Sequence, residues 1–265
     1  MGCLKLNYDY SERAECRNTG SIKKEASVLY FYITRIGGFQ YVYCSNNPIG
    51  RIDPDGRDDY EIFTNKKGET QINVIRTDDP TNSYTYVNAD GKKANLGTYD
   101  KTGNMVKLDQ STSFYEQTKY GQGYNYMDGD VAAGFLAGMY SYNQETGNKV
   151  EITQLNNASG GHSGREAGSG TSADVKYANL NGFKQGETVW TSGANFDKAN
   201  SQKLVDAFHK FGFNSPRGSI LTENAQGNGP ALSNSIFVDG KGKFHHKHHI
   251  HLQRFNNNII NVIKP

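Results

Sequence analysis

The end of the chain carries a histidine-rich stretch whose spacing suits an extended strand. The sequence FHHKHHIHL, residues 244–252, holds five of the chain's seven histidines. In an extended strand alternate side chains point to one face, so His249 and His251 would reach a common point. Neutral imidazole is the commonest metal ligand in proteins. A solvated metal-binding tract is the alternative interpretation. However, Ile250 and Leu252 interleave with the histidines as strand residues would, so the stretch predicts a metal-ligating strand.

Candidates for further ligands lie upstream of this strand. A catalytic zinc site usually has three protein ligands and leaves its fourth position open. A glycine-rich sequence, GGHSGR at residues 160–165, carries His162, and a new apolar run begins around Asp174. The strand that we expect at 150–155 would deliver the chain to the His162 loop, and a strand end is a rigid place for a ligand.

The order histidine, aspartate and then a distant H-x-H resembles one family of zinc peptidases. That family includes the penicillin-insensitive murein endopeptidases, the D-alanyl-D-alanine carboxypeptidases and dipeptidases, and the hedgehog-type domains. Its murein endopeptidases have a closing run of the form HHxHHxH, which His245 to His251 matches. The resemblance covers roughly the last 115 residues, about one domain. It implies that His162, Asp174 and His251 bind Zn²⁺ and that His249 is a catalytic histidine beside the metal.

The sequence departs from the family pattern in two places. Asp174 follows His162 by 174−162 = 12 positions, which is more than is usual in the family. The family's arginine has no match in residues 150–157, so Arg165 is the candidate that replaces it in anchoring the substrate. Glu166 is a candidate base. The resemblance implies a peptidoglycan stem or cross-link peptide as substrate, and a zinc ion that lowers the pKa of bound water toward about 7 and polarises the carbonyl.

A second resemblance lies near the start of the chain. The sequence YVYCSNNPIGRIDPDG, residues 41–56, contains two turns, since asparagine, aspartate, proline and glycine each favour turn geometry. It resembles the end of an RHS repeat-associated core, which in that family is followed by a variable C-terminal domain, frequently a toxin. Residues 1–58 would be a remnant of such a core. The resemblance implies an effector delivered by a specialised secretion route to the envelope of a target bacterium, with an immunity protein among its partners.

Charge and hydropathy argue against several other classes. The 29 basic residues nearly balance the 27 acidic ones, and a formal charge of +2 gives no field that would favour nucleic acid. No apolar run approaches the roughly 20 residues of a membrane helix. The first residues lack the apolar segment of a secretory signal. The 3 cysteines, all within the first 44 residues, do not form a disulfide framework.

The local patterns predict an α+β protein. With 30 glycines and 17 tyrosines, the chain is turn-rich and contains β structure. Residues 59–124 read as an antiparallel meander of hairpins, a spacer without chemistry of its own. Residues 125–265 form the peptidase-like domain, in which an antiparallel sheet carries the zinc ligands and helices flank it. The expected elements of this domain are helices over 128–146 and 196–212 and strands over 150–155, 219–222 and 235–238.

Two other functions remain open at the level of sequence. A His-metal nuclease toxin would also use histidines, and a non-catalytic metal-binding module would only store metal. The histidine run lacks the asparagine of the HNH pattern, and a nuclease would leave His162 and Asp174 unexplained. The sequence therefore favours a zinc-dependent peptidoglycan peptidase, a hydrolase of peptide bonds.

Overall fold

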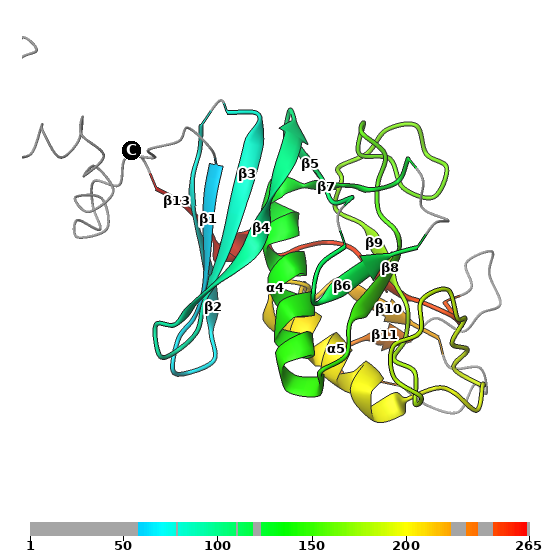
Figure 1. The fold of residues 1–265 in the computed structure, drawn as a ribbon. Coiled ribbons are helices and arrows are strands. Elements are labelled where there is room, and N and C mark those ends of the chain that lie inside the picture. The colour runs from blue at the N-terminus through cyan, green and yellow to red at the C-terminus, as the bar shows by residue number, and fades with distance from the viewer. Residues whose placement is uncertain are drawn as a thin grey trace, which may run out of the picture. The chain divides into compact units, whose positions relative to one another are not determined.

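The computed structural model of the chain describes residues 58–77, 79–109, 111–118, 123–223, 232–237 and 246–263. These residues belong to one compact unit, Arg57–Ile263. The core remnant predicted at 1–58, apart from Asp58, lies outside the described residues, as do Phe244 and His245 of the predicted histidine strand. Within the described part, two α-helices combine with a seven-stranded and a six-stranded sheet, so the chain has a mixed α and β fold (Figure 1).

The seven-stranded sheet has the order β13-β2-β1-β3-β4-β5-β7. Its strands are β1 (Asp58–Thr64), β2 (Thr70–Ile75), β3 (Thr81–Val87), β4 (Lys93–Thr102), β5 (Met105–Lys107), β7 (Tyr126–Asp128) and β13 (Ile260–Ile263). Burial alternates strictly along β1, as expected for a sheet with one face on the core. The predicted meander is wrong at one connection. β3 pairs in parallel with β1 and not with β2, whose other edge pairs with β13.

The six-stranded sheet has the order β11-β10-β12-β9-β8-β6. Its strands are β6 (Tyr115–Gln117), β8 (Val150–Gln154), β9 (Ala173–Val175), β10 (Ile220–Thr222), β11 (Ile236–Phe237) and β12 (Ile250–Leu252). The four central strands are antiparallel, whereas the edge pairs β10-β11 and β6-β8 are parallel. The sheet is therefore antiparallel where the predicted metal ligands lie, and the prediction is wrong at its edges.

The longer helix, α4 (Gly129–Thr146), has clear signals at both ends. The Asp128 side chain accepts from the backbone N–H groups of Asp130 and Val131, and Gly147 ends the helix in the left-handed conformation with φ 74°. α4 packs against strands β1, β3, β4, β5 and β7 and lies between the two sheets in Figure 1. The first turn of α4 follows directly on β7, the edge strand of the seven-stranded sheet.

The shorter helix, α5 (Lys198–Lys210), packs against α4. Asp197 caps its start, and Gly212, with φ 105°, follows its last turn. The two helices approach closely, since a Cβ at Gly138 would lie 2.8 Å from the ring of Phe208. A 3₁₀ turn, η2 (Asn257–Ile259), precedes β13. Both predicted helices are thus present, with ends within a few residues of those expected.

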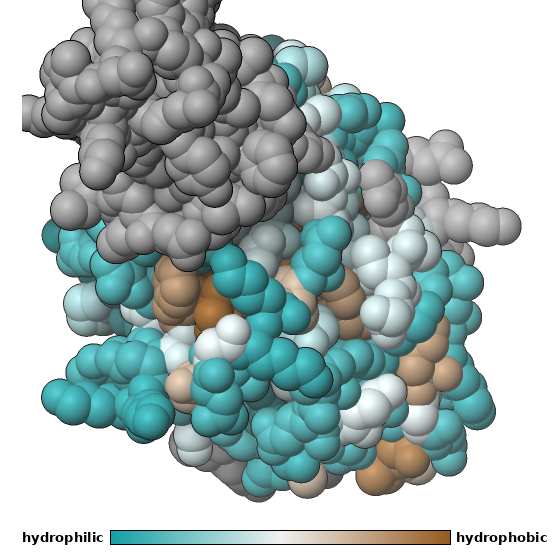
Figure 2. Space-filling model, turned by 60° about the vertical axis from the view of Figure 1, so that its left-hand side comes forward, coloured by the Kyte–Doolittle hydropathy of each residue, from teal (hydrophilic) through white to brown (hydrophobic). Residues whose placement is uncertain are grey.

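One hydrophobic core runs through both sheets and both helices. The boundary predicted at residue 124 falls between β6 and β7, and strands cross it in both directions. β6 precedes the boundary and belongs to the six-stranded sheet, whereas β7 and β13 follow it and belong to the seven-stranded sheet. The face drawn in Figure 2 is mainly hydrophilic, with hydrophobic residues in small separate patches. Within the described part of the chain, no helix has the length and apolar character needed to span a bilayer.

Candidate metal centre

His162 stands on a tight loop between β8 and β9. The Asn157 side chain closes this loop, because its oxygen accepts from the backbone N–H groups of Ser159 and Gly161 and its nitrogen donates to the carbonyl of Arg165. At Gly161 a Cβ would lie 2.0 Å from the Arg165 carbonyl oxygen, so this position requires glycine. The glycines seen in the sequence thus permit the close backbone contact that presents His162.

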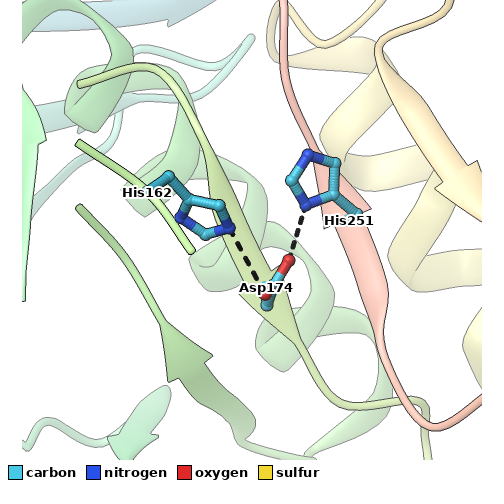
Figure 3. A group of neighbouring side chains, drawn as sticks. All are labelled: His162, Asp174 and His251. Carbon is cyan, nitrogen blue, oxygen red and sulfur yellow. Dashed lines mark hydrogen bonds and ion pairs between the residues drawn. The ribbon is translucent and has the colours of Figure 1, made fainter. Parts of the chain in front are cut away.

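The two ring nitrogens of His162 have different surroundings. Nδ1 donates to the carbonyl oxygen of Leu155 at 2.8 Å, which leaves the lone pair on Nε2 when the ring is neutral. Nε2 is buried, has no hydrogen-bond partner among the described residues, and lies 3.4 Å from Oδ2 of Asp174 (Figure 3). A lone pair and a carboxylate oxygen that face each other in a buried place call for a cation between them.

Asp174 and His251 face each other from neighbouring strands. They are paired in the register of β9 and β12, and Nδ1 of His251 donates to Oδ1 of Asp174 at 2.6 Å. One ligand atom from each of His162, Asp174 and His251 lies within 4.8 Å of the others, so the three residues could hold a metal ion. Two imidazole nitrogens and one carboxylate oxygen are a donor set that suits a divalent transition metal. The orphaned Nε2 of His162 shows that these residues fit such an ion.

The pKa values of the group reflect its burial and its charges. Burial alone would raise the pKa of Asp174, but the neighbouring imidazoles of His162, His251 and His249 hold it well below its usual value. Burial lowers the pKa of His162, whereas the Asp174 carboxylate raises it by more, so the net shift is upward. Asp174 therefore keeps a negative charge that a cation can neutralise.

The described histidines before β12, which are His246, His248 and His249, do not lie in a strand. Residues 246–249 bend, so the predicted histidine strand is confined to β12, yet His249 still converges on the site. Its Nε2 lies 3.7 Å from Oδ1 of Asp174 and 2.9 Å from Nδ1 of His246, and its Nδ1 lies 3.0 Å from Nδ1 of His248. The ring of His249 therefore lies between those of His246 and His248, beside Asp174.

Two buried residues hold this bend, and the sequence did not single them out. The Glu223 carboxylate accepts from the backbone N–H of His246 at 2.7 Å, and the Tyr177 hydroxyl donates to the His246 carbonyl at 2.9 Å. Glu223 is only 2% exposed. Tyr177 follows Asp174 closely on the chain, so the stretch that begins with β9 both supplies a ligand and fixes the backbone of the histidines.

His249 is neutral near pH 7. Burial lowers its pKa to about 4, although the Asp174 charge acts in the opposite direction. The neighbouring rings of His246, His248 and His251 lower it further. A neutral ring can donate one hydrogen bond and accept another.

The three predicted ligands open onto a cavity of about 840 Å³. Its lining residues come from several strands and loops: Thr118, Thr153, Gln154, His162, Ser163, Arg165, Ser172, Asp174, Lys176, Gly186, Thr188, Leu221, His246, His248, His249, His251 and Gln253. Arg165, a predicted site residue, lines the cavity with an exposed side chain. Glu166, the predicted base, is exposed and is not among the lining residues, and its role stays a prediction.

Lys176 also lines the cavity, although no sequence motif marks it as a site residue. Its Nζ lies 2.9 Å from the buried Glu151 carboxylate and donates to the Glu187 carbonyl. Alternation along β9 would have placed Lys176 on the same face as Asp174. Its charge is matched by Glu151, so Arg165 is the basic residue of the lining that stands exposed.

No protein-family model matches the chain, and no curated protein matches it in sequence.

Proposed function

We propose that the chain is a zinc-dependent peptidoglycan peptidase, a metallopeptidase of the endopeptidase or DD-carboxypeptidase type. The observation that carries the proposal is the group His162, Asp174 and His251, in which a buried nitrogen without a partner faces a charged carboxylate at the wall of a large cavity. The resemblance of the histidine run to murein endopeptidases supports the same assignment. The start of the chain supports a role as the C-terminal effector of an RHS-type protein.

In this proposal the three residues hold Zn²⁺, which supplies Lewis acidity toward water and toward the carbonyl of the scissile bond. Asp174 stays ionised because its hydrogen bonds lower its pKa, and the backbone carbonyl of Leu155 orients the ring of His162. The charge of Asp174 leaves the bound ion with a net positive charge, as electrophilic catalysis requires.

His249 acts on the substrate rather than on the metal. Its lowered pKa keeps the ring neutral at pH 7, so the ring carries one N–H, which in this proposal moves from a neighbouring histidine to the developing negative charge on the substrate oxygen. This role fits the ring better than delivery of a proton by an imidazolium ion, since burial disfavours the charged form. The contact with His246 limits how the ring can turn.

Arg165 gives the cavity a preference for anionic substrates. It is the basic side chain of the lining that is exposed, and a guanidinium binds a carboxylate with two parallel hydrogen bonds. Stem peptides of peptidoglycan end in a carboxylate. We therefore assign Arg165 to substrate orientation, in place of the arginine that the family carries elsewhere.

The test compares two polymers side by side. The zinc-loaded chain is incubated with purified murein sacculi and, separately, with plasmid DNA, and the Asp174→Asn variant is the control for both. We expect soluble muropeptides from the sacculi, intact plasmid, and no release by the variant. Nicked plasmid would identify a nuclease, and zinc binding without any cleavage would identify a metal-binding module.

A further inference from the structure

The chain's one tryptophan contacts a histidine that lines the metal-site cavity. Trp190 is 45% exposed, an unusual state for so large an apolar side chain. Its ring makes an edge-to-face contact with the ring of His248, with 5.2 Å between centroids and an angle of 86°. His248 lines the cavity, as does Thr188, two residues before the tryptophan. The indole thus extends the wall that bears the histidines.

The backbone around the indole is fixed to the histidine segment. The N–H of Thr191 donates to the carbonyl of Lys247 at 2.9 Å, and the N–H of Gly193 donates to the carbonyl of Trp190 at 2.7 Å. A Cβ at Gly193 would lie 3.1 Å from that carbonyl oxygen, so the turn is tight. A ring held in this way offers contact area at a low entropic cost on binding.

The cavity wall beyond the indole is rich in neutral hydrogen-bonding groups. Hydroxyls come from Thr118, Thr153, Ser172 and Thr188, and amides come from Gln154 and Gln253. Leu221 is the aliphatic side chain of the lining. An apolar peptide side chain would find few partners on this part of the wall, because Leu221 is its aliphatic member. A pyranose ring has an apolar C–H face for an indole and a rim of hydroxyl or acetamido groups for such a wall.

We propose that Trp190 and the hydroxyl and amide wall form a saccharide subsite, which binds an N-acetylhexosamine ring of the substrate. This inference rests on the proposed function and refines it, because it makes the substrate a peptide still attached to its glycan. The cavity has room for both parts, since its volume of about 840 Å³ is near the upper end of the roughly 300–1,000 Å³ typical of ligand sites.

Fluorescence of the full chain tests the subsite directly, since its one tryptophan is the reporter. The probe is the trimer of N-acetylglucosamine. We expect a saturable shift of the emission to shorter wavelength and protection of the indole from acrylamide. The Leu180→Ala variant is the matched control, because Leu180 is exposed on the preceding loop, and it should respond as the wild type does. The His251→Ala variant should also respond, since the subsite does not need the metal.

Two results of this titration would overturn the inference. One is the absence of any spectral change or protection at saccharide concentrations in the millimolar range. The other is protection by a sugar-free D-alanyl-D-alanine peptide without protection by the saccharide, which would assign Trp190 to the peptide. Both results are independent of hydrolysis, so they are distinct from a failure of the proposed function, which would show as an inactive wild-type protein.

The Trp190→Ala variant gives a second readout. The loss in kcat/KM on intact sacculi should exceed the loss on a soluble sugar-free stem peptide by about tenfold, the value of one aromatic contact of about 1.4 kcal/mol. Zinc content checks that the variant is folded. Equal losses on the two substrates would contradict a saccharide contact.

Discussion

A single unsatisfied nitrogen distinguishes the candidate site from an ordinary histidine cluster. His162 Nε2 is buried and has no hydrogen-bond partner among the described residues. It lies 3.4 Å from a carboxylate oxygen of Asp174, whose negative charge a cation would neutralise. Leaving such a group unsatisfied costs about 1–3 kcal/mol. The arrangement is therefore expected to take up a cation. His209, by contrast, lies in the last turn of α5 and is not part of this group.

The first prediction concerns Asp174. Asparagine has nearly the same shape but no charge, so the Asp174→Asn variant should fold and lose metal affinity by at least about 100-fold. Metal content after dialysis, measured by mass spectrometry, checks this. The His246→Ala variant is the control, because His246 contacts His249 but is not one of the three ligands, and it should retain its metal. Retention by the aspartate variant together with loss by the control would refute the ligand assignment.

The second prediction separates His249 from the ligands. The His249→Ala variant should keep its metal, since His162, Asp174 and His251 complete the group without it. Release of muropeptides from sacculi should fall by about 10² to 10⁴-fold, the range for removing an oxyanion donor or a positioned acid or base. Excess zinc should not restore the rate. A variant without metal, or one with a normal rate, would show that the role is misassigned.

The third prediction follows from the pKa of His249, which burial lowers from 6.5 to about 4. Between these values the unfolded chain binds a proton that the folded protein does not, so stability falls as the pH falls from 6.5 to 4. The raised pKa of His162 acts in another window, because its contribution is complete below pH 6.5 and disappears above it.

The metal-free His249→Gln variant should therefore lose less stability than the wild type across this window. The difference should be on the order of 2 kcal/mol. Urea denaturation at pH 6.5 and pH 4.5 in the presence of a chelator measures it. Identical pH dependence in the two proteins would mean that His249 titrates normally.

At the scale of elements, the loop before β9 is the part of the site whose geometry depends most closely on backbone contacts. Its glycines allow the backbone at Gly161 to approach Arg165 so closely that no side chain fits between them. A glycine-rich sequence predicts such a loop, but it does not show at which position a side chain would clash with the backbone. The answer depends on contacts between backbone atoms that only the folded loop makes.

The fourth prediction tests this loop. The Gly161→Ala variant should push Arg165 away, displace His162 and lower metal affinity at least about tenfold, while the rest of the fold remains. The Gly164→Asn variant is the control. Gly164 has φ 83° and open space where a Cβ would stand, and asparagine tolerates this conformation, so metal binding should change little. Titration with zinc in competition with a chromogenic chelator measures both variants, and equal affinities would refute the argument.

Local signals predicted the elements well and their partners poorly. Asp128 and Gly147 define the ends of α4, and alternation at Ile72 and Val74 locates β2, because these are properties of neighbouring residues. The meander prediction was wrong because pairing depends on distant strands, such as β13 beside β2. Likewise the three ligands could be named from their order, whereas Tyr177, Glu223 and Lys176 could not, since their roles arise from contacts across the sheet.

At the scale of the whole molecule, each sheet contains strands from both sides of the predicted boundary at residue 124. The chain leaves the six-stranded sheet after β6 and enters the seven-stranded sheet at β7. It then forms β8 to β12 of the six-stranded sheet, which bear the metal site, and ends in the seven-stranded sheet at β13. Because α4 lies between the two sheets and one hydrophobic core includes residues of both, neither sheet packs independently of the other. The hairpin region is consequently part of the support of the metal site.

The last prediction follows from this sharing and concerns the predicted domain of residues 125–265. Expressed alone, that fragment lacks β1 to β6, so α4 would expose the face that packs on the seven-stranded sheet, β13 would lose β2, and β8 would lose β6. A domain has only roughly 5–15 kcal/mol of stability, so losing these packing and pairing partners should be enough to unfold the fragment. We expect the fragment to show no cooperative melting transition and no stoichiometric zinc binding, whereas the full chain shows both. Circular dichroism and metal titration on the two proteins decide the matter, and a fragment that melts cooperatively with one zinc bound would establish residues 125–265 as an independent domain.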